Sequence, residues 1–294
     1  MKPAAFDYVA PDSLEEVLAV LAEQGDDAKI LAGGQSLVPM MNFRLAQPTL
    51  LVDCNRLSEL DFVRAGEGGS LHIGAMTRQR RVEQDPLVAR RAPLMHGTLP
   101  YVAHPQIRNR GTVGGNLAHA DPASELPVIA LARDFEMRLQ RAGSERRVAA
   151  KDFFIGLLET ALEPEEMLTE IVIPPLAPRT GWGFTEFSRR HGDYAQVGVA
   201  ALVTLDASDV CRQARLVYLS VGETPTDAPR AAQLLVGTSL DEEAMQAAAD
   251  MAAEHEIEPS GDIHASEAYK RHLARVLTVR VLREANERAK QAGG

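Results

Sequence analysis

A proline-rich segment at positions 173–181 divides this chain into two differently patterned regions. The segment reads Ile-Pro-Pro-Leu-Ala-Pro-Arg-Thr-Gly. Proline lacks a backbone donor and has a restricted φ angle, so such a run ends regular structure and is typical of a linker or a domain edge. With 294 residues the chain also exceeds the usual size of a single domain. We therefore expect two domains, with limits at 1–177 and 178–294.

The region before this segment is predicted to mix helices with strands. Ser13 and Glu16 form a capping-box pattern at the start of an apolar helical repeat, and Thr77 is expected to cap a later helix. Short strands are expected at 29–31, 50–53, 70–74, 135–140, 147–149 and 167–173. This pattern indicates a first domain of two subdomains, at about 1–55 and 56–177.

The region after the segment is predicted to form a smaller domain. Alternating apolar residues indicate strands at 195–206 and 215–221. Helices are expected to begin near Asp227, Ser239 and Ser266, and the last of them is apolar on one face and basic on the other. The sequence contains no internal repeat. The whole chain is therefore expected to be an α+β protein that ends in a smaller sheet-plus-helices domain.

Composition limits the partners that the chain can attract. Its formal net charge is -10, whereas nucleic acid and anionic lipid attract proteins with a surplus of Lys and Arg. Hydrophobic residues make up 45% and charged residues 24%, as in an ordinary globular protein. A phosphate-containing ligand would therefore have to be held by local backbone N–H groups and by one or two arginines.

The cysteines and the N-terminus bear on metal sites and on location. Cys54 and Cys211 are far apart and belong to no CxxC pair, so we expect no iron–sulfur or zinc site on this chain. Both are expected to be small buried hydrophobes. The first residues lack the apolar stretch of a signal peptide, and no run approaches the roughly 18 apolar residues of a membrane span. A cytoplasmic location is the resulting expectation.

A first glycine-rich loop has the composition of an anion-binding backbone. It reads Ala32-Gly33-Gly34-Gln35-Ser36, follows a predicted strand and precedes a helical turn. Glycine allows a phosphate to approach the backbone closely and allows turns with positive φ, while the start of a helix adds a positive dipole end. The alternative interpretation is a simple strand-to-helix turn.

A second loop at 112–116 reads Thr-Val-Gly-Gly-Asn and follows Arg108 and Arg110. Two such loops can hold one anion from both sides, although the second alone could be a tight turn with solvated arginines. Neither loop reads G-x-G-x-x-G, and the Gly-Trp-Gly at 181–183 precedes no helix, so nicotinamide binding is not indicated.

A group of polar residues follows the second loop. It comprises His119, Asp121 and Glu125. The Glu125 carboxylate has two interpretations, because it can accept hydrogen bonds from sugar hydroxyls or can cap the helix that it begins. The residues alone leave both open.

Four strings of the sequence together resemble one protein family. They are AGGQSLVPMM at 32–41, QIRNRGTVGGN at 106–116, DPASELP at 121–127 and RRHGDYA at 189–195. In this order they resemble the FAD-binding medium subunit of molybdenum hydroxylases, a family that includes carbon monoxide dehydrogenase, quinoline 2-oxidoreductase and relatives of xanthine dehydrogenase. The resemblance implies an FAD-binding domain of the PCMH/vanillyl-alcohol-oxidase type at 1–177. A carbon monoxide dehydrogenase flavoprotein-type C-terminal domain is implied at 178–294.

The resemblance also implies which residues hold FAD. The two loops would hold the diphosphate and neighbouring sugar atoms, and Leu37 and Val102 would line the cofactor. Glu125 stands where relatives often have aspartate, and Gln35 replaces a histidine of some members. Tyr194 would lie near the isoalloxazine, unless it is a core or interface tyrosine. The implied cofactor-binding residues are Ala32, Gly33, Gly34, Gln35, Ser36, Leu37, Val102, Thr112, Gly114, Gly115, Asn116, Glu125, Leu168 and Tyr194.

The function implied by the resemblance is electron transfer within a larger oxidoreductase. Substrate would be hydroxylated at a molybdenum cofactor on a large partner subunit, and electrons would pass through two [2Fe-2S] clusters on a small partner. They would then reach the FAD on this chain and leave to an external acceptor. The expected assembly is a heterotrimer, able to pair as a dimer of heterotrimers, with no catalytic acid or base on this chain.

Two other functions compete with this interpretation. One is a stand-alone FAD-dependent oxidoreductase resembling enolpyruvyl-UDP-GlcNAc reductase, which would need its own proton donor and substrate pocket. The other is a flavin-free interaction module, for which both glycine loops would be incidental. The substrate and the terminal acceptor cannot be read from this sequence, because the absent partner subunit would select the substrate.

Overall fold

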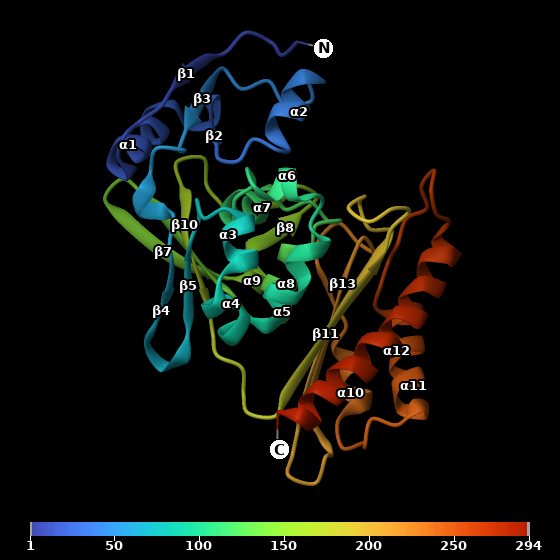
Figure 1. Cartoon of the computed structure of the whole chain (residues 1–294). Coiled ribbons are helices and arrows are strands. Elements are labelled where there is room, and N and C mark those ends of the chain that lie inside the picture. Colours follow the sequence, from blue (N-terminus) through green and yellow to red (C-terminus); the bar gives the residue numbers. More distant parts are fainter. Residues whose placement is uncertain (1, 293–294) are drawn as a thin grey trace.

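The computed structural model describes residues 2–292, and its first part is a small parallel sheet (Figure 1). The three strands have the order β1-β3-β2. They are β1 (Asp7–Val9), β2 (Ala28–Leu31) and β3 (Leu50–Asp53). Helix α1 (Leu14–Gln24) buries Val17 and Leu21 in one core with Val52 of β3. The short helix α2 (Leu37–Asn42) follows the first glycine loop.

Helix α1 begins as its sequence pattern predicts. The Ser13 hydroxyl accepts a hydrogen bond from the N–H of Glu16 at 3.2 Å. The Glu16 carboxylate accepts in return from the N–H of Asp12 at 2.9 Å, one residue earlier than the usual capping box. Gly25 ends the helix with a φ of 50°, which glycine adopts without strain.

The second part is an antiparallel sheet of five strands in the order β4-β5-β10-β6-β7. The strands are β4 (Val63–Ala65), β5 (Leu71–Gly74), β6 (Glu136–Arg141), β7 (Ser144–Ala149) and β10 (Met167–Ile173). The chain leaves this sheet after β5 and forms helices that stand beside it in Figure 1. These are α3 (Gln79–Gln84), α4 (Pro86–Arg91), α5 (Pro93–Thr98), α6 (Pro105–Arg108), α7 (Val113–His119) and α8 (Glu125–Ala132). The short helix α9 (Ala150–Phe153) follows β7. A separate small hairpin comprises β8 (Phe154–Gly156) and β9 (Glu159–Thr160).

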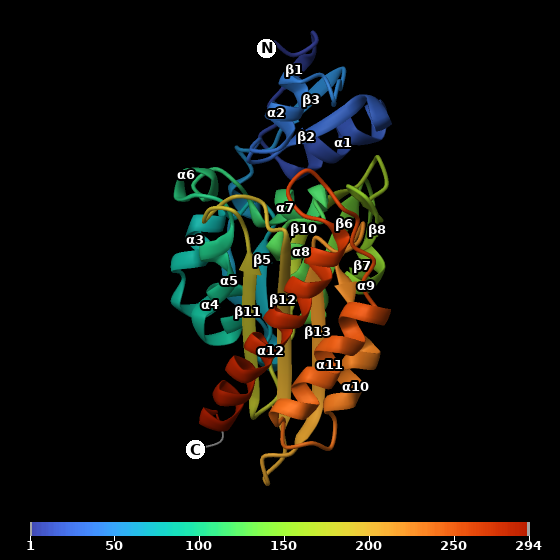
Figure 2. The ribbon, with the colours of Figure 1, turned by 90° about the vertical axis from the view of Figure 1, so that its right-hand side faces the viewer.

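The third part is the C-terminal sheet and its helices. The strands are β11 (Thr180–Phe187), β12 (Val197–Leu205), β13 (Cys211–Leu219) and β14 (Thr226–Asp227), antiparallel and in chain order. The helices are α10 (Pro229–Leu235), α11 (Glu242–His255) and α12 (Glu267–Gln291). Figure 2 shows α10, α11 and α12 in front of the sheet, on the face turned away from α8.

Helix α8 joins the second and third parts into one core. Every one of its residues is buried, which agrees with a sequence that is apolar all round after Glu125. It contacts α5 and α7 on one side and β12 and β13 on the other. The buried cluster around it therefore includes residues from both sheets, among them Met137 and Leu219.

One face of β11 packs against the preceding helices. Trp182 occupies the space left by Gly97 of α5, where an added Cβ would lie 2.4 Å from the Trp182 ring. Phe184 meets the Tyr101 ring edge-on with centroids 5.2 Å apart. Glu186 is the next residue on this side of the strand, because side chains alternate along β structure. We call Trp182, Phe184 and Glu186 the interdomain face of β11.

The opposite side of β11 lies directly against helix α12. A Cβ at Gly181 would lie 1.8 Å from the carbonyl oxygen of Ala285, and one at Gly183 would lie 2.4 Å from that of Val281. These glycines therefore serve close helix-to-strand packing, which explains a Gly-Trp-Gly that belongs to no nucleotide fingerprint.

The structure differs from the sequence-based expectation in several local features. Thr77 does not cap a helix, because its hydroxyl bonds the backbone of Phe62 at 3.0 Å and α3 begins after Arg78 instead. Strand β11 was not predicted, and it starts at Thr180, inside the predicted linker, because pairing with β12 extends regular structure toward the prolines. Strand β13 begins earlier than predicted, at Cys211, and α11 is capped by Asp241 and not by Ser239. The domain limits at 177 and 178 stay a prediction. No helix within the described part of the chain has the length and apolar character needed to cross a membrane.

The packing of β11 on α12 gives a stability prediction. We expect Gly181→Ala to lower the free energy of unfolding by about 1–3 kcal/mol. The new methyl group would clash with backbone atoms of α12, which can move only if the helix shifts away from the strand. Urea unfolding measures the effect. Gly261→Ala is the control, since its Cβ would approach nothing closer than 3.4 Å. Equal stability of the two variants would show that Gly181 is not required for the packing of β11 against α12.

Candidate functional site

The first glycine loop presents a row of free backbone donors. It leaves β2 after Leu31, turns at Gly34 with a φ of 72°, and enters α2. No described residue accepts a hydrogen bond from the backbone N–H groups of 33–37. The Gln35 side chain donates to the carbonyl oxygen of Gly33 at 2.9 Å and so braces the turn. Unpaired donors at the start of a helix are suited to an anionic group.

A cleft of about 390 Å³ opens at this loop. It is lined by Leu31, Ala32, Gly33, Gly34, Gln35, Val38, Pro39, Asp53, Asn55 and Arg110. Asp53 stands at the end of β3, beside the strand that carries the loop. Burial opposes its ionisation, but hydrogen bonds from Tyr8 and Asn55 hold the pKa of Asp53 below its ordinary value. The cleft thus combines backbone donors with one carboxylate and one guanidinium.

The second glycine loop turns its backbone donors inward. The N–H groups of Val113 and Gly114 donate to the carbonyls of Thr77 and Ala75, at 3.0 and 2.8 Å. The N–H of Gly115 donates to the Thr112 hydroxyl at 3.0 Å, which caps helix α7. Gly114 is needed for packing, because its Cβ would lie 2.5 Å from that of Ala75. This loop therefore offers few free backbone donors to a ligand.

The two loops, distant in the sequence, touch each other in the structure. A Cβ at Gly33 would lie 2.5 Å from the carbonyl oxygen of Arg110 and 2.7 Å from the Cα of Gly111. A Cβ at Gly115 would lie 3.3 Å from that of Ala32. Gly33 is consequently required by the contact between the loops as well as by any ligand.

The two arginines before the second loop have different environments. Arg108 is buried, bonds the Glu83 carboxylate at 2.9 and 3.1 Å, and donates to the carbonyl oxygen of Val102 at 2.8 Å. Arg110 is exposed and lines the cleft. Only Arg110 is therefore available to an anion there, whereas Arg108 holds the segment that leads to the loop.

The other predicted site residues occupy several environments. Ser124 donates to the amide oxygen of Asn116 at 2.8 Å and so ties the second loop to Glu125, the first residue of α8. Glu125 is only 7% exposed, and burial raises the pKa of its carboxyl to about 7. Leu37 is half-buried at the start of α2. Tyr194 is 71% exposed, so it is not a core tyrosine.

Val102 and Leu168 lie in the apolar core. Their exposed fractions are 5% and 4%, and neither lines the cleft at the first loop. Sequence reasoning missed Asp53 and Asn55, which line the cleft. An acidic residue at the end of a parallel strand next to the glycine loop was a usable signal for Asp53.

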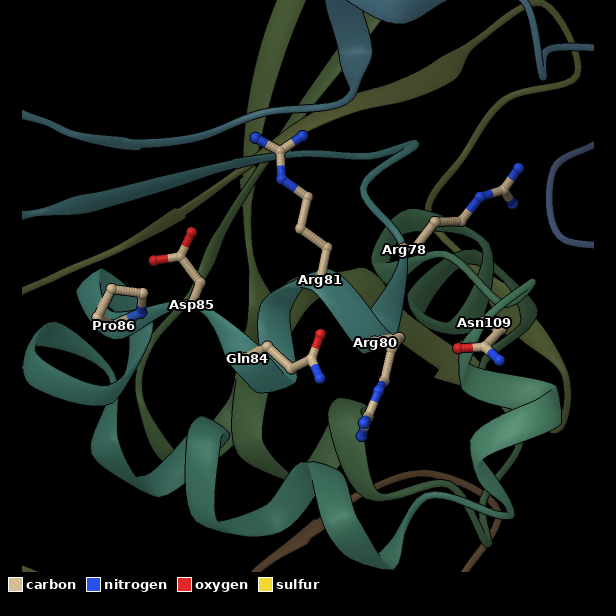
Figure 3. Close-up of a pocket in the computed structure, with 7 residues that line it drawn as sticks. All are labelled: Arg78, Arg80, Arg81, Gln84, Asp85, Pro86 and Asn109. Carbon is tan, nitrogen blue, oxygen red and sulfur yellow. The ribbon is translucent and has the colours of Figure 1, made fainter.

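A second hollow of about 530 Å³ contains several arginines but is not a convergent binding site. Figure 3 shows that Arg78, Arg80 and Arg81 point away from one another. Arg80 pairs with Glu83 at 2.9 Å, and Arg81 pairs with Asp61 at 2.7 Å. The lining residues are Arg78, Arg80, Arg81, Gln84, Asp85, Pro86 and Asn109.

The thiols and acidic groups show no metal-binding arrangement within residues 2–292. No three His, Cys, Asp or Glu side chains in that range come together as ligands. Cys54 and Cys211 are both buried, and burial raises the pKa of their thiols to about 12 and about 11. Both cysteines are therefore packed as neutral thiols.

Two family profiles match most of the chain. The first is described as the FAD binding domain in molybdopterin dehydrogenase and matches residues 4–176. The second is described as the CO dehydrogenase flavoprotein C-terminal domain and matches residues 182–285.

Individual relatives are similar over nearly their full length. The alpha subunit of the 6-hydroxypseudooxynicotine dehydrogenase complex of Paenarthrobacter nicotinovorans is 42% identical, over 99% of this chain and 97% of the relative. The medium chain of carbon monoxide dehydrogenase of Hydrogenophaga pseudoflava is 38% identical, over 97% and 98%. The crystal structure of quinoline 2-oxidoreductase from Pseudomonas putida 86 matches with a TM-score of 0.93 and 41% identity, covering all of both chains. A structure of the Hydrogenophaga pseudoflava enzyme matches with a TM-score of 0.94, over 98% of this chain and 99% of that one.

The buried pair of Arg108 and Glu83 gives a prediction for the site. We expect Arg108→Met to lower the free energy of unfolding by about 2–3 kcal/mol, because it removes the buried partner of the Glu83 carboxylate and leaves only the more exposed Arg80 to pair with it. Burial opposes ionisation of Glu83, yet hydrogen bonds from Arg108 and Arg80 keep its pKa below the ordinary value. The contribution of the pair is therefore present at neutral pH and lost as the pH falls through that lowered pKa.

Urea unfolding at neutral and acidic pH measures this effect. Arg141→Met is the matched control, because Arg141 pairs with the exposed Glu163 and should cost no more than about 1 kcal/mol. A similar small loss in both variants would refute a structural role for the buried pair.

Proposed function

Because this chain belongs to the FAD-binding medium subunits of the molybdenum hydroxylase family, we propose that it transfers electrons as the flavin subunit of a heterotrimeric oxidoreductase. In this proposal FAD receives electrons from [2Fe-2S] clusters on a small partner subunit and passes them to an external acceptor. A large partner subunit carries the molybdenum cofactor and selects the substrate.

The observation that carries the proposal is the row of free N–H groups at 33–37. A diphosphate has several anionic oxygens close together, and consecutive backbone donors at a helix start can bond them without any side-chain cation. A net charge of -10 would not attract an anionic dinucleotide. Local backbone donors can nevertheless bind its diphosphate. We therefore place the anionic part of FAD in the cleft at this loop.

The proposal assigns different tasks to the two glycine loops. The first, from Ala32 to Ser36, would hold the diphosphate through its backbone, with Leu37 and Arg110 beside it. The second would act through the Asn116 side chain, because the backbone N–H groups of 113–116 already donate within the protein. The side of the site formed by the second loop would then be shaped by Thr112, Gly114 and Gly115.

Residues beyond the loops complete the proposed site. Asp53 could accept hydrogen bonds from the adenosine ribose, since it lies at the cleft and its lowered pKa keeps it ionised at neutral pH. Glu125 and Tyr194 would lie toward the ribityl chain and the isoalloxazine. Val102 and Leu168 would support the cofactor through the core, because both are buried.

The chemistry of the proposed reaction belongs to the cofactor. When bound, FAD can take electrons one at a time and release two. The chain itself would hold the diphosphate, orient the ring and exclude water. No acid or base of this chain is needed for substrate hydroxylation, which would take place on the large partner.

The proposed assembly rests on the names of the relatives. They are named as medium chains, or as subunits of dehydrogenase complexes, and one structure is named for lacking the Mo-pyranopterin moiety of its molybdenum cofactor. A heterotrimer, alone or as a dimer of heterotrimers, agrees with these names. A cytoplasmic location stays a prediction.

Two substitutions of Gly34, to Asp and to Asn, test the FAD site with side chains of nearly the same shape but different charge. Gly34 has a φ of 72°, which Asn and Asp tolerate better than other residues, and an added Cβ would meet only side-chain atoms of Leu31 and Val38. We expect Gly34→Asp to weaken FAD binding at least about tenfold relative to Gly34→Asn, because only the carboxylate repels the diphosphate. FAD titration followed by flavin fluorescence measures the difference. Equal affinity in the two variants would rule out a diphosphate at this loop.

Co-expression with the neighbouring open reading frames tests the subunit role. We expect a complex that contains flavin, iron and molybdenum, measured by absorbance and metal analysis of the purified material. If the isolated chain reduces a soluble substrate with NADPH, the stand-alone oxidoreductase is correct instead. A chain that takes up no FAD on titration, alone or in the complex, would favour the flavin-free interaction module.

A further inference from the structure

A polar network joins the two glycine loops at the edge of the cleft. One terminal nitrogen of the Arg78 guanidinium donates to the amide oxygen of Asn55 at 2.5 Å, and the other donates to the carbonyl oxygen of Arg110. Neither acceptor is a carboxylate, so the guanidinium bridges two neutral groups. Asn55 follows β3 in the first part of the molecule, whereas Arg78 and Arg110 belong to the second. A single side chain therefore connects the two parts.

Arg78 is fixed to the second loop by its own backbone. It forms an antiparallel β-bridge with Thr112, and the N–H of the next residue, Gln79, donates to the carbonyl oxygen of Gly111 at 2.9 Å. The Thr112 hydroxyl in turn caps α7. The position of the guanidinium is thus set by the same segment that forms the second side of the cleft.

The carbonyl group that Arg78 holds is the one against which the first loop packs. A Cβ at Gly33 would lie 2.5 Å from the carbonyl oxygen of Arg110, so the two backbones are in direct contact there. A guanidinium bonded to this oxygen limits how far the second loop can move away from Gly33. The hydrogen bond therefore bears on the width of the cleft, which Gly33 and Arg110 both line.

Asn55 holds the backbone of the first loop. Its amide nitrogen donates to the carbonyl oxygen of Ala32 at 2.9 Å and to the Asp53 carboxylate at 2.5 Å, while its oxygen accepts from Arg78. A trans peptide group is planar, and its C=O and N–H point in opposite directions. Fixing the Ala32 carbonyl therefore also fixes the direction of the Gly33 N–H, which is the first of the free donors in this loop.

We propose that Asn55 and Arg78 are positioning residues for the diphosphate of FAD, an inference that rests on the proposed function. We call these two side chains the Asn55–Arg78 clasp. The clasp orients the first backbone donor and holds the second loop beside it, so the site has its shape before the anion arrives. Donors that are already in place lose less conformational entropy on binding than donors that must first be ordered.

The forked shape of the guanidinium is essential to this role. Arg78 reaches two acceptors at once with two nitrogens of one rigid plane, whereas a lysine ammonium carries the same charge on a single nitrogen. Arg78→Lys therefore removes the bridge but keeps the charge. An arginine that acted only by attracting the diphosphate would tolerate this substitution.

The first experiment tests the clasp without flavin. It is a double-mutant cycle of urea unfolding that compares Asn55→Ala, Arg78→Met and the double variant with the wild type. Each single substitution already breaks the shared hydrogen bond. The unfolding equilibrium constant of the double variant should therefore be about three- to tenfold smaller than the product of the two single effects predicts. Effects that simply multiply would overturn the clasp.

The second experiment measures FAD affinity by titration, followed by flavin fluorescence, under conditions in which every variant is folded. We expect Arg78→Met and Arg78→Lys each to raise the dissociation constant about three- to tenfold, which corresponds to the loss of one or two hydrogen bonds. Arg81→Met is the matched control, because Arg81 lies in the same hollow, points away from Arg78 and bonds Asp61 (Figure 3). It removes one positive charge nearby without loosening either loop, so its dissociation constant should equal that of the wild type.

The possible results separate positioning from charge. Wild-type affinity in Arg78→Lys, or an equal loss in Arg81→Met, would show that the charge and not the bridge matters, and would overturn the positioning role. Wild-type affinity in Arg78→Met would overturn it as well. A wild-type chain that binds no FAD, alone or in the complex, would instead overturn the proposed function, and the unfolding cycle would still decide whether the clasp holds the two parts together.

Discussion

The contact between the two glycine loops is the constraint on which the site depends. Gly33 lies so close to the backbone of Arg110 and Gly111 that no side chain fits between them. This contact joins the small parallel sheet to the helices of the second sheet and fixes where the first loop points. The free donors at 33–37 face a cleft because the second loop closes the other side.

Within this frame the protein separates anion binding from structural support. The first loop leaves its N–H groups unpaired, whereas the second loop uses those of 113–116 to bond the segment that follows β5 and to start α7. A similar division applies to the arginines, since Arg108 is buried with Glu83 and Arg110 reaches the cleft. A chain with a net charge of -10 can therefore present a local site for an anion.

The C-terminal domain joins the rest of the protein through β11. Its interdomain face is apolar at Trp182 and Phe184, where it packs against Gly97 of α5 and the Tyr101 ring. This apolar part holds the domains together through a shared core, to which helix α8 and strands β12 and β13 also belong. Glu186 is the acidic residue of the same face, and burial raises the pKa of its carboxyl to about 8.

The sequence by itself determined the local features: the cap of α1 at Ser13, the strand before the first glycine loop, and the positive φ at Gly34. These follow from propensities and hydrogen bonds among residues a few positions apart, which a sequence displays directly. Only the tertiary structure decided which loop keeps its donors free and which arginine is buried. Those outcomes depend on strand register and on packing between residues far apart in the chain, and no local pattern encodes them.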